Sequence, residues 1–188
     1  MKNNMKTGVI LFIATSASSF TTISEKKVDV EQSTISWKGY KVTGKHEGTI
    51  NLKEGTLIFE GDKLKGGNFI VDMTSLADTD LEGEWKGKLE GHLKSDDFFG
   101  VEKHPTANLT ITKVETNEDY YTVTGDLTIK DITNPVTFDM TVDENSANAS
   151  LKIDRSKFNI RYGSPSFFNN LKDKAIYDEF ELNVNLSF

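Results

Sequence analysis

Apolar and polar residues alternate along most of this 188-residue chain, from about residue 28 to the C-terminus. The clearest run is residues 180–188, in which Phe, Leu, Val, Leu and Phe alternate with Glu, Asn, Asn and Ser. A period of two is typical of β-strands that bury one face and expose the other. The same rhythm over residues 121–129 and 136–142, and in several shorter runs, predicts about nine strands.

Short clusters of Gly, Asn, Asp and Pro separate these runs at intervals of about 10 to 15 residues, which is typical of strands that pair with their sequence neighbours. We therefore expect an all-β domain with mostly antiparallel strands. Such strands bury one face each either as a two-sheet sandwich or as a closed barrel, and composition does not decide between them. A barrel of about eight strands is the size that can hold one small ligand.

One stretch, residues 78–106, breaks the alternation. Leu81, Trp85, Leu89 and Leu93 recur at intervals of four and would share one stripe of a helix, with capping side chains at residues 78–80. Glycines within the stretch shorten the expected helix. The pattern predicts a short helical insertion around residues 78–95, followed by a loop that contains adjacent phenylalanines.

The N-terminus has the features of a secretory signal peptide. Lys2 and Lys6 precede a short apolar run over residues 8–14, and small residues follow at 17–19. The apolar run is less than half of what a membrane-spanning helix needs. We expect residues 1–19 to be removed near Ser19, and residues 20–188 to form a single domain that is periplasmic or secreted.

Charge and cysteine content exclude several kinds of partner and chemistry. The chain has 22 Lys and Arg against 29 Asp and Glu, a net charge of −7, and its cations are not clustered. Nucleic acid is therefore an unfavourable partner, and so is stable anchoring on an anionic membrane. The absence of cysteine removes disulfides, thiolate nucleophiles and lipidated cysteine.

Six blocks of sequence, in the same order, resemble the YceI-like family of exported lipid-binding proteins. They are SWKG at 36–39, GKHEGTI at 44–50, LKGGNFIVDMTSL at 64–76, HLKSDDFFGVEKHPTA at 92–107, GDLTIKDITNPV at 125–136 and IDRSKFNI at 153–160. The resemblance covers residues 28–188. It implies a lipocalin-like antiparallel barrel with a hydrophobic channel for long-chain amphiphiles of the polyisoprenoid or isoprenoid-quinone type, and it implies export. It implies no catalytic residues.

Candidate ligand-binding residues are the large apolar side chains at inward positions, the phenylalanines of the loop, and one histidine. They are Trp37, His46, Phe59, Phe69, Met73, Phe98, Phe99, Ile129, Phe138 and Phe158. The aromatic residues on strands either fill the core or line a channel. The loop residues Phe98 and Phe99 either anchor the loop or cap the channel.

The three histidines, His46, His92 and His104, lie in separate segments without metal-ligand spacing, so we expect no metal site. His46 shares strand parity with Ile50 and should point inward, where it either hydrogen-bonds a lipid headgroup or has a structural role. Asp154 and Arg155 suggest an ion pair at a strand end, and the arginine is suited to an anionic headgroup. Neither Gly-x-Ser-x-Gly nor a Ser-His-Asp grouping is evident, which argues against a nucleophilic hydrolase.

These features together predict an exported binding protein, not an enzyme, that holds an isoprenoid-type lipid for storage or transport and needs no cofactor. Two alternatives remain open: an isomerase or hydrolase that acts on a small substrate in the same cavity, and a structural or adhesion module with a filled barrel. A cavity of a few hundred Å³ would favour the carrier. The sequence leaves the oligomeric state open, a dimer included.

Overall fold

The computed structural model describes residues 21–188, so the predicted signal peptide lies outside the described residues. This part of the chain folds into nine β-strands, one α-helix and two 3₁₀ turns. The strands are β1 (Ile23–Lys27), β2 (Asp29–Lys41), β3 (Gly44–Glu60), β4 (Lys63–Asp78), β5 (Thr106–Thr116), β6 (Tyr121–Ile129), β7 (Ile132–Val142), β8 (Ser146–Asp154) and β9 (Ile176–Ser187). The helix α1 is Gly83–Lys94, and the 3₁₀ turns are Arg155–Phe158 and Lys172–Lys174.

The strands form a closed antiparallel barrel. Each strand from β4 to β8 pairs with the next, β9 returns to β2, β2 pairs with β3, and a β3–β4 pairing closes the ring of eight strands. The ninth strand, β1, pairs with Thr56–Glu60 of β3, beyond the part of β3 that pairs with β2. β1 and β2 therefore lie end to end along the same side of β3. The predicted lipocalin-like barrel is confirmed.

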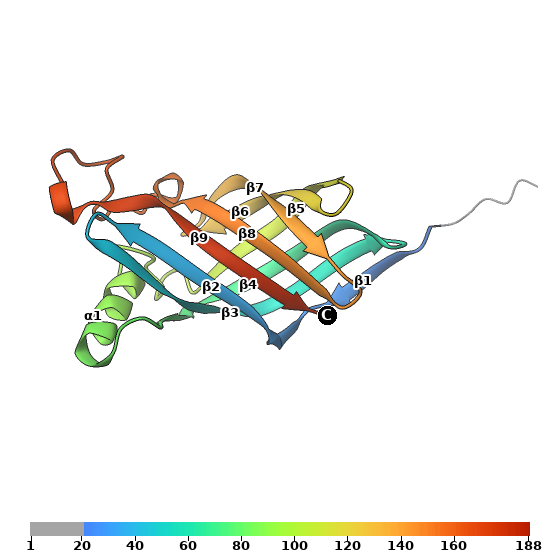
Figure 1. Ribbon diagram of the computed structural model, residues 1–188, viewed down its shortest axis with the longest axis horizontal. Helices are drawn as coiled ribbons and strands as arrows, with labels where there is room; N and C mark the ends of the chain where they lie inside the picture. Colours follow the sequence, from blue (N-terminus) through green and yellow to red (C-terminus); the bar gives the residue numbers. More distant parts are fainter. Residues whose placement is uncertain (1–20) are drawn as a thin grey trace, which may run out of the picture.

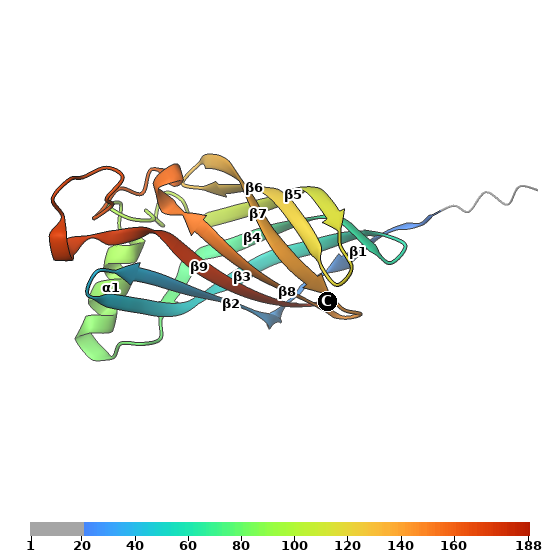
Figure 2. The ribbon, with the colours of Figure 1, turned by 45° about the horizontal axis from the view of Figure 1, so that its top comes forward.

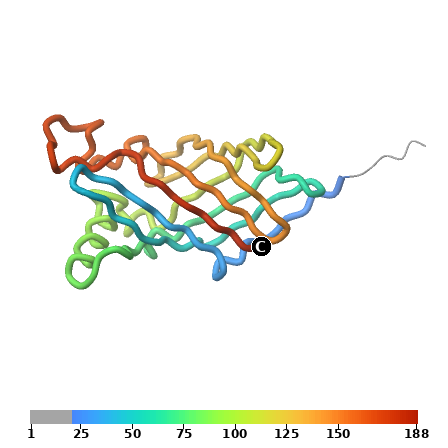
Figure 3. Tube along the Cα trace, viewed as in Figure 1, coloured from blue at the N-terminus to red at the C-terminus, as the bar shows by residue number. Residues whose placement is uncertain are grey.

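The two ends of the barrel are built from different elements. Figure 1 shows α1, the β2–β3 turn and the segment before β9 at one end, and β1 with the C-terminus at the other. The rotated view in Figure 2 and the trace in Figure 3 show the same arrangement. We call the first the mouth end, because the cavity described below reaches it, and the second the closed end.

The predicted helical insertion is present, but it begins later than expected. Leu81 and the predicted caps at residues 78–80 lie before α1, whose N-cap is Glu82 without a side-chain hydrogen bond. Leu89 and Leu93 line the cavity, whereas the Trp85 side chain is 70% exposed and Lys88 lies over its ring. The stripe prediction is wrong for Trp85 because residues four apart are displaced by about 40° around a helix, which puts Trp85 about 80° from Leu93. Within residues 21–188, no helix has both the length and the apolar character needed to cross a membrane.

The closed end is a packed hydrophobic core. Leu57, Val123 and Ala147 are completely buried there, and the rings of Phe59 and Phe188 pack 6.1 Å apart. The ammonium group of Lys26 lies over both rings, and it donates a hydrogen bond to the carbonyl of Glu144. These contacts close the barrel at this end.

A tight contact between β3 and β4 fixes the wall near the mouth. Trp37 Nε1 donates to the carbonyl oxygens of Ala77 (3.2 Å) and Thr49 (3.3 Å), and its ring lies over Gly48. A Cβ atom at Gly48 would lie 1.9 Å from the Ala77 oxygen and 2.6 Å from the Trp37 ring. Only glycine fits at this position.

Candidate functional site

The barrel encloses a cavity of about 290 Å³ that runs from its middle to the mouth end. This is close to the lower end of the range of about 300–1,000 Å³ typical of ligand pockets. Its wall is almost entirely apolar except at the mouth, where polar side chains gather near the β2–β3 turn, on α1 and at the ends of β8 and β9: Tyr40, Lys41, His46, His92, Arg155 and Tyr177. Tyr177 lines the cavity and is half exposed, so the cavity reaches the surface there.

Most of the residues predicted from the sequence lie in this wall. Eight of the ten candidates line the cavity: Trp37, His46, Phe69, Met73, Phe98, Phe99, Ile129 and Phe138. Alternation accounts for the six that lie on strands, because inward-facing positions in a closed barrel converge on one interior, while Phe98 and Phe99 come from the loop after α1. The filled-barrel alternative does not agree with this cavity.

Two candidates lie elsewhere. Phe59 packs against Phe188 at the closed end, and Phe158 is 1% exposed in the 3₁₀ turn after β8; neither lines the cavity. The prediction is wrong for both residues. Strand parity tells which side of the sheet a side chain faces, but not whether it reaches the cavity or the packed core.

The loop phenylalanines have both of the roles that the sequence left open. Phe98 and Phe99 are 6% and 8% exposed, their ring centroids are 5.0 Å apart, and both line the cavity. Phe99 meets Phe180 of β9 edge to face, and Lys130 Nζ donates to the Phe98 carbonyl. The loop is thus anchored to the barrel by the same rings that cover the cavity.

Arg155 is the most deeply buried charged side chain that lines the cavity, at 1% exposed. Its guanidinium donates to the carbonyl oxygens of Tyr177 (3.1 Å), Ile160 (2.9 Å) and Ile176 (2.9 Å), and it lies 3.5 Å from Asp178. Burial lowers the pKa of Arg155, and the Asp178 carboxylate opposes that shift. The guanidinium therefore joins the two segments that frame the mouth.

The predicted ion pair between adjacent residues Asp154 and Arg155 is wrong. The Asp154 carboxylate instead accepts hydrogen bonds from the backbone and hydroxyl of Ser156, as an N-terminal cap does. The partner of Arg155 is Asp178, which the β8–β9 pairing brings alongside. The acidic residue next to Arg155 in the sequence is therefore not its ion-pair partner, which lies on the neighbouring strand.

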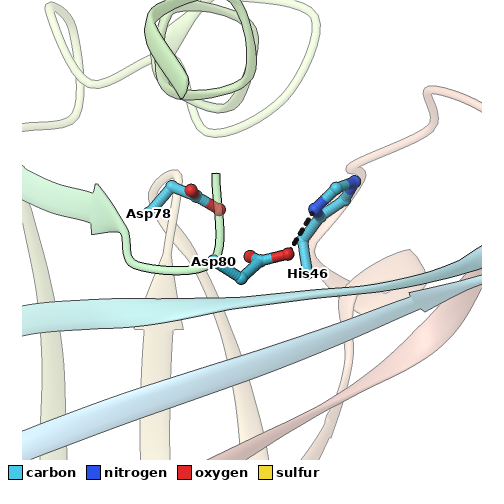
Figure 4. A group of neighbouring side chains, drawn as sticks. All are labelled: His46, Asp78 and Asp80. Atoms are coloured by element: carbon cyan, nitrogen blue, oxygen red, sulfur yellow. Dashed lines mark hydrogen bonds and ion pairs between the residues drawn. The ribbon is translucent and has the colours of Figure 1, made fainter. Parts of the chain in front are cut away.

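A second polar group at the mouth joins β3 to the end of β4. Strand pairing places Gly48 opposite Asp78, so His46, two residues earlier, faces Asp80, two residues later. His46 Nδ1 lies 3.1 Å from Asp80 Oδ2, and the ligand atoms of His46, Asp78 and Asp80 all lie within 4.8 Å of one another. Figure 4 shows these three side chains converging.

The two aspartates of this group differ in their surroundings. Asp78 is completely buried, and burial together with the nearby Asp80 carboxylate raises its pKa. Burial also acts to raise the pKa of Asp80, but hydrogen bonds from the Glu47 backbone and His46 outweigh it and lower that pKa. His46 also lines the cavity, so this group lies beside the channel.

Sequence reasoning missed several wall residues. Tyr40, Lys41, His92 and Tyr177 line the cavity at the mouth, and the Tyr40 hydroxyl donates to Glu181 (3.1 Å). The ring of His92 packs against Phe98 and Tyr162. His92 lies on the same face of α1 as Leu89 and Leu93. The helical spacing of these two leucines is the one sequence feature that could have placed His92 in the wall.

Residues 27–188 match the YceI-like domain. The chain belongs to the YceI-like family. It is 33% identical over 93 residues to a UPF0312 protein of Pectobacterium atrosepticum and 34% identical over 97 residues to protein YceI of Escherichia coli O157:H7. Each match covers 49% of this chain and 46% of the relative, so the chain spans about half the length of the curated relatives it matches.

Solved structures show the same YceI-like barrel. BcnA of Burkholderia cenocepacia superposes with a TM-score of 0.65 at 23% identity, over 85% of this chain and 98% of BcnA. A polyisoprenoid-binding domain from Saccharophagus degradans gives 0.57 at 13% identity, over 88% and 97% of the two chains. The YceI protein of Campylobacter jejuni gives 0.53 at 18%, over 100% and 98%. At these identities the likeness establishes the fold.

Proposed function

We propose that this protein is an exported carrier that holds an isoprenoid-type lipid, a polyprenyl chain or an isoprenoid quinone, in the barrel channel. The observation that carries the proposal is the apolar cavity whose polar wall residues are gathered at the mouth end, where it reaches the surface beside Tyr177. An apolar tail gains about 0.8 kcal/mol per buried CH₂ group, and a few polar groups suffice to orient its head.

The distribution of polar groups supports binding rather than catalysis. Arg155 and the Tyr40–Glu181 pair are tied to protein partners at the mouth, while the deeper wall consists of side chains such as Met140 and Phe138. The headgroup would lie among the mouth residues Lys41, His92 and Tyr177. The polyisoprenoid-binding domain with the same fold supports the choice of tail.

The surface of the mouth end supports loading from that end. Of the eight large hydrophobic side chains that are exposed within residues 21–188, six belong to segments at the mouth: Val42, Trp85, Tyr162, Phe167, Phe168 and Tyr177. Exposed apolar groups gathered around an opening are typical of binding sites. A lipid that enters here would meet apolar side chains before it reaches the cavity.

The ligand is tested by mass spectrometry of an organic extract of the natively purified protein. A polyprenyl lipid or isoprenoid quinone in about equimolar amount is the expected result. The emptied protein should then bind decaprenyl phosphate and a ubiquinone with a long tail. It should not bind a ubiquinone analogue with a short tail. Failure to carry lipid and failure to bind either long-chain probe would overturn the proposal.

Export is tested separately. The mature N-terminus should fall within a few residues of Phe20 if residues 1–19 are a signal peptide. Intact-mass analysis of the protein in the periplasmic or culture fraction measures this directly. A retained Met1 would overturn the proposed location without bearing on the lipid.

A further inference from the structure

The group formed by His46, Asp78 and Asp80 contains an unpaired buried oxygen. Asp78 Oδ1 accepts a hydrogen bond from the backbone of Leu81 (2.8 Å), but the buried Oδ2 has no hydrogen-bond partner. Figure 4 shows this carboxylate directed towards Asp80 and His46. A buried, unpaired carboxylate oxygen is costly unless a proton or a cation satisfies it.

The other two side chains present their free atoms to the same point. Asp80 uses Oδ1 to accept from the Glu47 backbone (2.9 Å), which leaves Oδ2 facing His46 Nδ1 at 3.1 Å. Two atoms that each lie about 2.0–2.2 Å from one tetrahedral ion are about 3.3 Å apart, close to this separation. The backbone hydrogen bonds hold both carboxylates in place, as the surroundings of a metal site do.

We propose that His46, Asp78 and Asp80 bind a single divalent transition-metal ion, with Zn²⁺ as the best match. One imidazole nitrogen and two carboxylate oxygens are a donor set that Zn²⁺ accepts, and the softer-ligand sites that need cysteine are ruled out by composition. The ion would neutralise the two facing carboxylates and draw the Asp78 oxygen inwards. Three protein ligands leave a fourth position for water or another ligand.

No sequence motif marks this site, because its ligands come from β3, from the last residue of β4 and from the segment after β4. His46 is separated from Asp80 by 34 residues, and only the register of β3 on β4 brings them together. Glu90 of α1, which accepts from the Asp78 backbone (2.9 Å), adds further negative charge nearby. Of the three ligands only His46 also lines the cavity, so metal binding is measured on the lipid-free protein.

The test is a titration of the chelator-treated, lipid-free protein with Zn²⁺ at pH 7.5, followed by calorimetry. We expect one saturable site, with His46→Ala, Asp78→Asn and Asp80→Asn each weakening binding at least about tenfold. Co²⁺ in place of Zn²⁺ should give a visible absorption band that the same substitutions remove. His46 and Asp80 are partly exposed, so their variants should fold normally even if Asp78→Asn does not.

His104→Ala is the matched control. His104 also lies beside a carboxylate, with Nδ1 3.0 Å from Asp131 Oδ2, but a third ligand does not join that pair among the described residues. Binding by His104→Ala should equal that of the parent. The proposal is overturned if the parent shows no saturable Zn²⁺ binding, if His104→Ala loses as much affinity as His46→Ala, or if Asp78→Asn binds like the parent. The last outcome would mean that a proton joins the two aspartates.

Discussion

At the closed end of the barrel buried side chains contact one another, whereas at the mouth end they surround a cavity. Leu57, Phe59 and Phe188 belong to the first region, and Phe98, Phe99 and Leu93 to the second. Buried polar groups follow the same division, since Asp78 and Arg155 both lie towards the mouth. Both ends are built from the same alternating strands, so strand pattern alone does not distinguish a core from a binding site.

The difference shows how one barrel divides stability from function. The closed end gains its stability from apolar contact, which requires only volume and shape. The mouth end cannot pack in this way without filling the cavity, and it is held instead by hydrogen bonds from Arg155 to three carbonyl groups. Substitutions at the two ends should therefore fail for different reasons.

The largest effect is expected for Arg155→Met. The change leaves the carbonyls of Ile160, Ile176 and Tyr177 without their donor and removes the charge that faces Asp178, and breaking a buried pair costs about 3–5 kcal/mol. Urea unfolding measures the free energy lost.

Arg161→Met is the matched control for that experiment. Arg161 lies at the same end but is exposed, with its guanidinium over the Phe167 ring. Its loss should change stability little. If Arg155→Met is as stable as Arg161→Met, hydrogen bonds from Arg155 do not hold the mouth together.

A pair of leucines compares the two ends directly. Leu57 is completely buried at the closed end, and Leu57→Ala should cost about 2–5 kcal/mol because it opens a new cavity. Leu182 already borders the channel, so Leu182→Ala only enlarges an existing cavity and should cost less. Urea unfolding and lipid binding should separate them: the first variant loses stability and keeps its lipid affinity, the second changes affinity. Equal losses of stability would contradict the division.

Two alanines on β8 sharpen the comparison further. Ala147 and Ala149 are two residues apart and face the same interior, but only Ala149 lines the cavity. Ala147→Phe overfills a packed core and should cost about 1–3 kcal/mol. Ala149→Phe places its ring in the channel, where it should cost little stability and exclude the lipid. Thermal unfolding and lipid titration of both variants test this. If Ala149→Phe binds lipid with the affinity of the parent, the lipid does not occupy the channel.

The sequence predicts the strands well because the two-residue period reports a local property, the facing of each side chain. It does not predict depth along the barrel, which is why the wall prediction is wrong for Phe59. Phe158 lies in a 3₁₀ turn, where the alternation of a strand does not apply. It also does not predict partners across strands. Arg155 bonds to carbonyls 5 to 22 residues away, and His46 meets Asp80 only through strand register. The overall barrel followed from the resemblance to a known family, and these polar contacts from the three-dimensional structure alone.

The smallest effect is expected at the loop that carries Phe98 and Phe99. A hydrogen bond and ion pair with Lys103 lower the pKa of Asp96. Because the folded-state pKa is the lower one, Asp96 contributes stability above the carboxyl's ordinary pKa, and that contribution is lost as pH falls through the lowered value. Asp96→Asn should therefore reduce the melting temperature slightly at pH 7 and leave it unchanged in strong acid.

Asp97→Asn is the control, since the structure shows no ion pair for Asp97 among residues 21–188. Its melting temperature should follow that of the parent at both pH values. Asp96 is exposed, so solvent screens the pair and the difference at pH 7 should shrink further in high salt. A difference in melting temperature between Asp96→Asn and the parent that persists in acid or in high salt would show that Asp96 acts through its loop conformation and not through its charge. The loop would then be anchored at the mouth by the phenylalanine rings and Lys130.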